Sequence, residues 1–216
     1  MSNIKKFLDA EDFYKGLESL DAKLGENPMI TAFAPVNLMV VGGFFAVTYL
    51  KNRKATEDID YLLDPEWAND QDIKEPLRNC IEAVASKHNY LPGWANEDIG
   101  LFVTKKAREV LMRKAIEQDI VLWNGENIRI FAAPVEWILE TKLRRIHTSV
   151  RGRKAEGDMS DALAILKYLR DKNGAKLDME YYRAHNVNGF DVMPDYSTMR
   201  RVAAAYREKY GEEIFN

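Results

Sequence analysis

The sequence predicts an α+β protein that forms one domain over residues 1–216, with a mixed α/β head at about residues 1–134 and a helical part at about residues 135–216. Two observations carry this prediction. In the head, short apolar runs that suit strands alternate with longer amphipathic segments that suit helices. After residue 135, only helical periodicity remains. The length of 216 residues allows one domain with a sizeable core.

Short apolar runs predict strands over residues 36–41, 59–63, 120–123 and 128–132. The last two flank Asn124-Gly125, a dipeptide that favours a hairpin turn. Helical spacing of apolar residues predicts helices over residues 12–24, 44–51, 72–88, 107–117, 135–148 and 197–210. Residues 91–98 are expected to form a loop. Another helix is expected to begin at Asp158 and end near Asn173, after a basic loop over residues 151–157.

Composition excludes several classes of protein. No apolar run reaches the roughly 18 residues that span a bilayer, and residues 1–9 lack the apolar stretch of a secretory signal. The single cysteine, Cys80, excludes an internal disulfide and a cysteine-based metal cluster. The three histidines show no metal-ligand spacing, which argues against zinc. We therefore expect a cytoplasmic protein that has no membrane partner.

The first motif with chemical content is a glycine pair. Residues 36–41 lead into Gly42-Gly43, and a helix is expected to follow. Glycine permits unusual backbone angles and lets a phosphate approach closely. The start of a helix offers free N–H groups and a positive dipole end. A Gly-Gly pair after a strand is often only a tight turn, so the motif needs a second one beside it.

The second motif is a pair of aspartates, Asp58 and Asp60, at the start of the strand over residues 59–63. On a strand, residues i and i+2 point to the same face, and the apolar Ile59 between them is expected to face the core. Magnesium prefers oxygen ligands, usually one or two carboxylates together with substrate phosphates. An Asp-x-Asp pair alone is often only solvated charge, but the two motifs in this order are more specific than either.

The segment over residues 40–63 resembles the signature of the nucleotidyltransferase superfamily, which has the fold of DNA polymerase beta. The resemblance is closest to the abortive-infection toxin branch, which includes tRNA-modifying toxins of mycobacteria. This branch adds a lysine on a helix and an Asp-x-x-Asp helix start, and the chain has Lys142 and the stretch Asp158-Met159-Ser160-Asp161. The matching pieces lie between residues 36 and 169. The resemblance implies a nucleotidyltransferase fold.

The resemblance also implies an activity: magnesium- or manganese-dependent transfer of a nucleoside monophosphate from a nucleoside triphosphate to a hydroxyl of RNA, protein or a small molecule. Asp58 and Asp60 would hold the metal, and Asp158 would act as general base or further metal ligand. The nucleotide-binding residues that it implies are Gly42, Gly43, Thr56, Lys142 and Arg145.

Lys142 can also be interpreted from its own surroundings. It lies four residues from both Ile138 and Ile146, on the apolar stripe of its helix. A lysine there either snorkels to the stripe edge or reaches a polar cleft. If Lys142 contacts the triphosphate, Lys142→Met is expected to keep or raise the melting temperature while weakening triphosphate binding and transfer. Asp158 is expected to cap its helix, and Asp161 is expected to be exposed.

Two departures from the family pattern leave an alternative open. The turn has Phe44 where many active members have a serine after the glycines. The strand expected to supply a third carboxylate contains Ile128-Arg129-Ile130 instead. The alternative is therefore a catalytically inactive nucleotide-binding or protein-interaction module on the same fold. The nearby basic residues, including Arg153 and Lys154, are either solvated surface or, next to the expected triphosphate, a contact for phosphates or a polynucleotide backbone.

Overall fold

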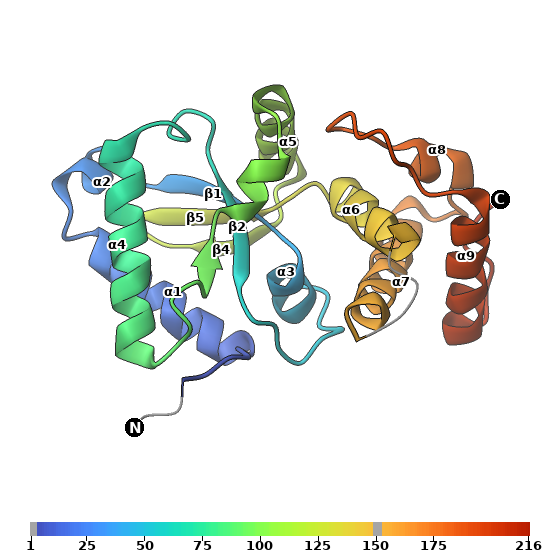
Figure 1. Ribbon diagram of the computed structural model, residues 1–216, viewed down its shortest axis with the longest axis horizontal. Helices are drawn as coiled ribbons and strands as arrows, with labels where there is room; N and C mark the ends of the chain where they lie inside the picture. The colour runs from blue at the N-terminus through green and yellow to red at the C-terminus, as the bar shows by residue number, and fades with distance from the viewer. Residues whose placement is uncertain (1–3, 149–152) are drawn as a thin grey trace. The chain divides into compact units, whose positions relative to one another are not determined.

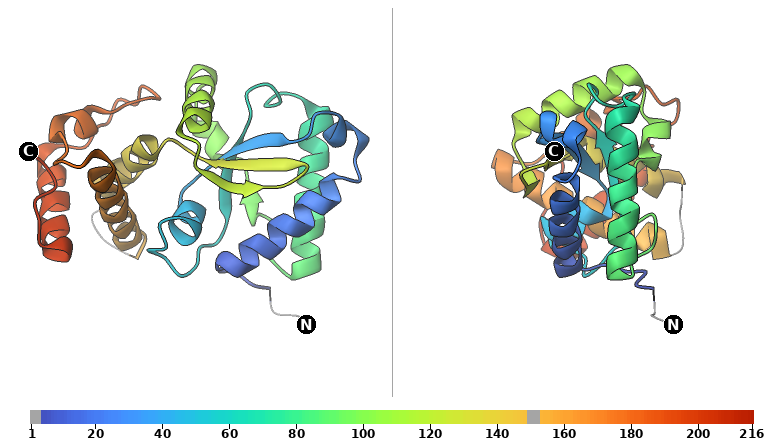
Figure 2. Two further views of the ribbon diagram at one scale, coloured as in Figure 1. Left: turned by 180° about the vertical axis from the view of Figure 1, so that it is seen from behind. Right: turned by 90° about the vertical axis from the view of Figure 1, so that its left-hand side faces the viewer.

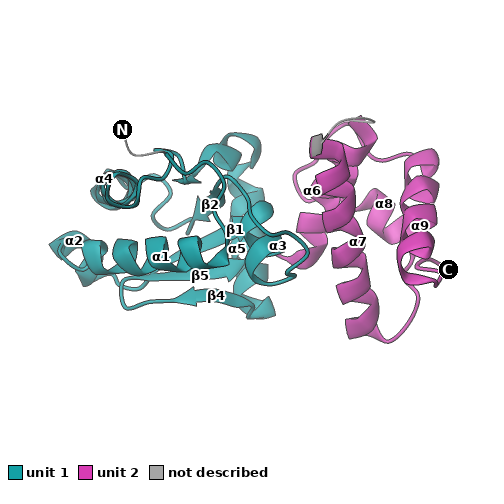
Figure 3. Ribbon diagram, turned by 90° about the horizontal axis from the view of Figure 1, so that it is seen from below, with its two compact units in different colours: residues 1–133 teal, residues 134–216 magenta. Residues whose placement is uncertain are grey.

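The computed structural model of the protein describes residues 4–148 and 153–216, and these form a mixed α+β structure. The chain divides into two compact units, residues 1–133 (unit 1) and residues 134–216 (unit 2), coloured separately in Figure 3. All the strands of the described residues belong to unit 1, and unit 2 is built from helices.

The described residues of unit 1 form five strands and six helical segments. The predicted elements of this unit follow one another in the predicted order, and three short segments that the sequence does not predict lie among them. Its strands are β1 (Val36–Val41), β2 (Ile59–Leu63), β3 (Ala95–Asn96), β4 (Val121–Asn124) and β5 (Ile128–Ala132). Its helices are α1 (Ala10–Leu24), α2 (Pro28–Ala32), α3 (Gly43–Thr48), α4 (Gln71–His88), the 3₁₀ helix η1 (Asp98–Phe102) and α5 (Lys105–Gln118).

The strands form one mixed sheet in the order β3-β2-β1-β5-β4. β1 is antiparallel to β2, with Val41 opposite Asp60, and parallel to β5 on its other side. β4 and β5 form the antiparallel hairpin that Asn124-Gly125 predicts, which Figure 2 shows in its left-hand view. The expectation that residues 36–41 and 59–63 are neighbouring strands is confirmed, so the glycine pair and the aspartates lie at the same end of the sheet.

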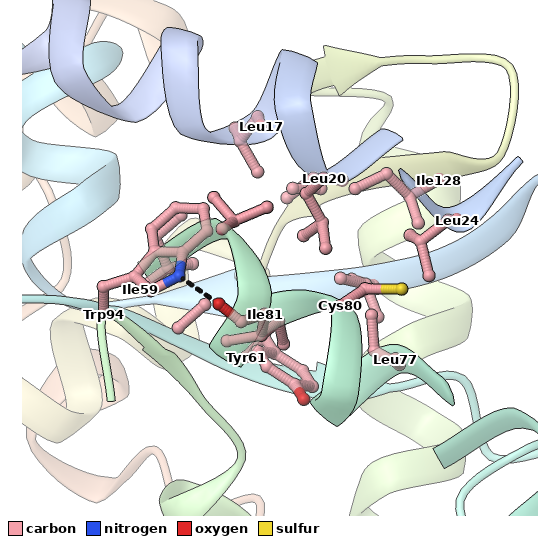
Figure 4. Close-up of a cluster of buried hydrophobic side chains, with 14 of the residues drawn as sticks. Leu17, Leu20, Leu24, Ile59, Tyr61, Leu77, Cys80, Ile81, Trp94 and Ile128 are labelled. Carbon is pink, nitrogen blue, oxygen red and sulfur yellow. Dashed lines mark hydrogen bonds between the residues drawn. The ribbon is translucent and has the colours of Figure 1, made fainter. Parts of the chain in front are cut away.

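Helices α1 and α4 lie side by side over one face of the sheet (Figures 1 and 2). Their apolar stripes pack against alternate residues of β1, β2 and β5, which include Leu38, Tyr61 and Ile130. Trp94, fully buried, donates a hydrogen bond of 3.0 Å from its indole nitrogen to the carbonyl oxygen of Ile81 (Figure 4). Because Ile59 also lies in this core, its neighbours Asp58 and Asp60 point to the opposite face.

A carboxylate on α1 joins this helix to the hairpin. Asp21 accepts hydrogen bonds from the backbone N–H groups of Glu126, Asn127 and Ile128, at 2.9–3.0 Å. A Cβ atom on Gly125 would lie 2.1 Å from an Asp21 oxygen, so the turn needs glycine at this position. The hairpin register and the position of α1 are therefore fixed by one side chain.

Unit 2 contains α6 (Val135–Thr148), α7 (Arg153–Asn173), α8 (Met179–Ala184) and α9 (Tyr196–Tyr210). Helix α7 begins at Arg153, so Asp158 lies inside the helix, and the expectation that it caps the helix is wrong. The expected basic loop is helical from Arg153 onward, while residues 151 and 152 lie outside the described residues. Strand β3 and helices α2 and α8 were not predicted, because two to six residues are too few for periodicity to detect.

Candidate functional site

The Gly42-Gly43 turn links β1 to α3 and is packed too closely for side chains. Gly42 has φ +75° and ψ −138°, which side chains disfavour. A Cβ atom on Gly43 would lie 2.0 Å from the hydroxyl oxygen of Thr56. Thr56 is held in place by two backbone hydrogen bonds to Leu8, each of 3.0 Å or less. The turn therefore lies directly against Thr56, which is two residues before Asp58.

The same turn meets the Asp60 carboxylate. A Cβ atom on Gly42 would lie 3.0 Å from Asp60 Oδ2, closer than nearly all real Cβ contacts. Asp60 is half-buried on β2 and faces the turn because it pairs with Val41 across the ladder. Glycine at this position thus lets the backbone of the turn and the Asp60 carboxylate come close together.

Asp58, the other carboxylate, is positioned from the sheet edge. The side-chain amide of Asn96 on β3 donates to Asp58 Oδ2 at 3.3 Å, and Asn96 lies opposite Asp60 in the ladder. From the resemblance to the family, a third carboxylate was expected on the strand over residues 128–130. That strand, β5, pairs with β1 and not with β2. The outer neighbour of β2 is β3, which was expected to be loop, so Asn96 was missed.

The donor set fits a weakly held, hard divalent cation. Within residues 4–148 and 153–216, no three side chains of His, Cys, Asp or Glu come together as a metal-binding group. Asp60 on β2 and Asp58, the residue just before this strand, supply two carboxylates on either side of the core residue Ile59. Magnesium commonly uses two carboxylates and completes its shell with water and substrate phosphates. The residues therefore suit a cation that arrives together with a triphosphate.

Lys142 of unit 2 lies in a buried ionic cluster. Its side chain is 2% exposed, and its ammonium lies 3.0 Å from Asp158 Oδ1 and 2.6 Å from Asp161 Oδ2. Asp161 is fully buried, so the expectation that it is exposed helix charge is wrong. The apolar periodicity of α7 did not indicate this burial. Asp158 and Asp161 are three residues apart on α7, so both turn toward Lys142 of α6. Lys142 thus neither snorkels nor lies free.

Arg145 completes this cluster from the outside. Its guanidinium donates two hydrogen bonds to Asp158, of 2.8 Å from Nε and 2.7 Å from Nη2. Its side chain is 54% exposed, in contrast to the three buried members of the cluster. Arg145 is therefore the solvent-accessible cation of this cluster.

A third buried carboxylate in unit 2, Glu140, was not singled out by the sequence. It is 3% exposed and accepts hydrogen bonds from the backbone N–H of Val187 at 3.1 Å and from Arg144 Nε at 3.3 Å. The His185 ring lies 3.9 Å away. Burial raises the pKa of Glu140 above its ordinary value, although the N–H of Val187 and the nearby Arg144 and His185 counteract this shift.

The raised pKa of Glu140 predicts a pH dependence of stability. From about pH 4.5 up to the folded pKa, the folded state binds more protons at Glu140 than the unfolded state does, so stability falls as pH rises through this window. Glu140→Gln is expected to flatten this slope. Chemical unfolding of both proteins between pH 4.5 and 7.5 measures it. Glu208→Gln, an exposed change on α9, should keep the wild-type slope, and a Glu140→Gln slope equal to wild type would contradict the prediction.

Comparison with protein-family models, curated proteins and solved structures gives no match to this chain. No helix within the described residues has the length and apolar character needed to cross a membrane.

Proposed function

We propose that the protein is a magnesium-dependent nucleotidyltransferase with the nucleotidyltransferase fold, which moves a nucleoside monophosphate from a triphosphate to a hydroxyl acceptor. One observation carries this proposal: the Gly42 backbone approaches Asp60 so closely that a Cβ atom would lie 3.0 Å from its carboxylate. A phosphate-binding turn and a metal-binding carboxylate are thereby brought together on adjacent strands.

Each residue of unit 1 has a defined part in this proposal. Asp58 and Asp60 hold Mg²⁺ or Mn²⁺, which when bound neutralises charge on the triphosphate and the leaving pyrophosphate. The backbone N–H groups of Gly42 and Gly43 bind phosphate oxygens at the start of α3, and the Thr56 hydroxyl is a further donor beside them. Asn96 orients Asp58 through its hydrogen bond of 3.3 Å.

Unit 2 contributes Lys142, Arg145 and Asp158 in the same proposal. Arg145, the half-exposed member, keeps the phosphate-binding role that the resemblance implies. Asp158 is 4% exposed and paired with Lys142 and Arg145, so it acts as base or further metal ligand only if these ion pairs open. Lys142 already binds Asp158 and Asp161, so it contacts a triphosphate only by exchanging a carboxylate for a phosphate oxygen. The contribution of unit 2 can be tested separately from that of the aspartate pair, because the two sets of residues belong to different units.

The test is a transfer assay on the full chain. The protein is incubated with each nucleoside triphosphate labelled at the α-phosphate, with Mg²⁺ or Mn²⁺, and with either total tRNA or a mixture of candidate proteins. We expect label to become covalently attached to an acceptor and pyrophosphate to be released in equal amount. The Asp58→Asn/Asp60→Asn double variant should release none. Absence of both label and pyrophosphate with every combination would exclude nucleotidyl transfer to these acceptors.

A catalytically inactive module on the same fold is the second candidate, and a specific observation favours it. The strand beside β2 carries Asn96 where a further carboxylate would strengthen the metal site, and no third acidic side chain joins Asp58 and Asp60 within the described ranges. This candidate predicts triphosphate binding without transfer. Calorimetry with a non-hydrolysable triphosphate, run beside the transfer assay, separates the two functions.

A further inference from the structure

A groove in unit 1 runs beside β2, between α4 and the chain over residues 92–98. Its volume is about 400 Å³, within the range of pockets that hold small molecules. The groove exists because β3 pairs only with Ile59 and Asp60, which leaves the rest of β2 without a strand on its outer side. Its floor is apolar and is formed by Leu63, Leu77, Ile81 and Ala95.

Tyr61 brings a polar group to this apolar floor. Its side chain is 7% exposed, and its ring packs beside Leu77 and Ile81 (Figure 4). Tyr61 lines the groove, and its hydroxyl has no hydrogen-bond partner among the described residues. Burial raises the pKa of Tyr61 well above its ordinary value, so the hydroxyl keeps its proton and remains a donor. A ligand whose acceptor atom reaches this hydroxyl forms a hydrogen bond that the almost buried donor otherwise lacks, and this hydrogen bond favours binding.

The charges around the groove favour an anionic acceptor. Glu97 is already neutralised by Arg108 at 2.7 Å and Lys74 at 3.1 Å. Arg78 lines the groove and acts electrostatically on Tyr61, and it forms no ion pair or hydrogen bond within the described parts of the chain. Two further acids of the lining, Glu82 and Asp98, are exposed, and water and salt screen them. Arg78 is exposed as well, so the almost buried Tyr61 hydroxyl is the donor that lacks an acceptor, and Arg78 is a second donor available beside it.

We propose that this groove is a binding site for a small carboxylate with an apolar or aromatic body. The body packs on the floor formed by α4, β2 and β3, and the carboxylate oxygens accept hydrogen bonds from the Tyr61 hydroxyl and the Arg78 guanidinium. Neither residue belongs to the proposed nucleotide site, and the inference extends beyond nucleotidyl transfer. Its test contains no metal or nucleotide, so its outcome is independent of the proposed function.

The test uses three probes with the same ring and different head groups: phenylacetate, 2-phenylethanol and phenethylamine. Each is titrated into the full-length, ¹⁵N-labelled protein, and amide shifts are followed by NMR. We expect phenylacetate to bind most tightly, with the largest shifts at Tyr61, Leu77 and Ala95. Tyr61→Phe should weaken phenylacetate about 3–10-fold, the usual effect of one hydrogen bond, and Arg78→Met about tenfold or more.

Two controls keep the result specific. Arg113 is an exposed residue of α5 that does not line the groove. Arg113→Met removes an equivalent charge there and should leave the affinity for phenylacetate unchanged. The melting temperature of Tyr61→Phe should stay at or above wild type, because its hydroxyl has no partner among the described residues to lose. The proposal is overturned if phenylacetate does not saturate by roughly 10 mM, if phenethylamine binds more tightly, or if both groove variants bind phenylacetate as the wild type does.

Discussion

Replacing Lys142 with methionine is expected to destabilise unit 2 by about 3–5 kcal/mol, because the change leaves buried carboxylates without their cation. The ammonium lies 3.0 Å from Asp158 and 2.6 Å from Asp161, and all three side chains are at most 4% exposed. In a unit of this size, such a loss lowers the melting temperature by more than roughly 10 °C. From the sequence, methionine was expected to replace Lys142 without loss of stability. The two buried carboxylates that pair with Lys142 reverse this expectation.

Thermal unfolding followed by circular dichroism measures this effect. Lys167→Met is a matched control on α7, since its ion pair with Asp171 is solvent-exposed and should contribute less than about 1 kcal/mol. Adding Asp161→Asn to Lys142→Met should recover part of the loss, because one unpaired charge is removed with its partner. An unchanged or higher melting temperature would show that burying the ammonium costs more free energy than its two ion pairs return.

Nucleotide affinity of the same variant decides whether Lys142 also has a role in binding. If Lys142→Met remains folded at low temperature and binds a magnesium–triphosphate complex as the wild type does, Lys142 is a structural residue. Weaker binding at a temperature where the variant is folded would support the phosphate contact assigned to it.

Replacing Asp58 or Asp60 with asparagine is expected to weaken binding of the magnesium–triphosphate complex at least about tenfold, since even residues that only orient metal ligands typically change affinity about 10–100-fold. Asp60→Asn should have the larger effect, because its carboxylate lies against the Gly42 turn. Asp58 acts from the sheet edge beside Asn96. Both variants should keep their fold, as both side chains are only half-buried.

Isothermal titration calorimetry at fixed Mg²⁺ concentration measures these affinities. Glu57→Gln is the matched control, because it removes the same charge from the neighbouring, exposed position. The site assignment fails if both aspartate variants bind the triphosphate with wild-type affinity, or if Glu57→Gln weakens binding equally. Binding in the absence of Mg²⁺ should be weak in all four proteins, because phosphates and carboxylates then repel each other.

Much of the fold follows from local pattern. The runs over residues 36–41, 59–63 and 128–132 are long enough and apolar enough to specify strands, and the structure has strands with these bounds. Helix α6 likewise spans the residues that its periodicity predicts. Helix α7 begins at Arg153, five residues before the predicted start. The pairing of Asp158 with Lys142 and Arg145 joins two helices, and the spacing of residues within one helix does not reveal it.

The candidate site was predictable in part for the same reason. Spacing along one strand places Asp58 and Asp60 on one face, and the glycines identify the turn that precedes them. Nothing local indicates that Asn96 would reach Asp58, since β3 is two residues long and exists only through its pairing with β2. The role of Asp21 escaped prediction likewise, because its partners lie more than 100 residues away in sequence.

The shape of the sheet edges affects how copies of this protein behave at high concentration. An exposed, regular edge strand can pair with the edge of another molecule and start aggregation. At one edge, β3 is only two residues long, and beyond it the backbone of Leu63 on β2 is hydrogen-bonded by the side chains of Glu97 and Arg108. At the other, β4 has a register shift between Val121 and Trp123, and an irregularity of this kind twists a strand away from straight pairing. Both edges are therefore poor templates for strand addition, although the central strands are strongly apolar.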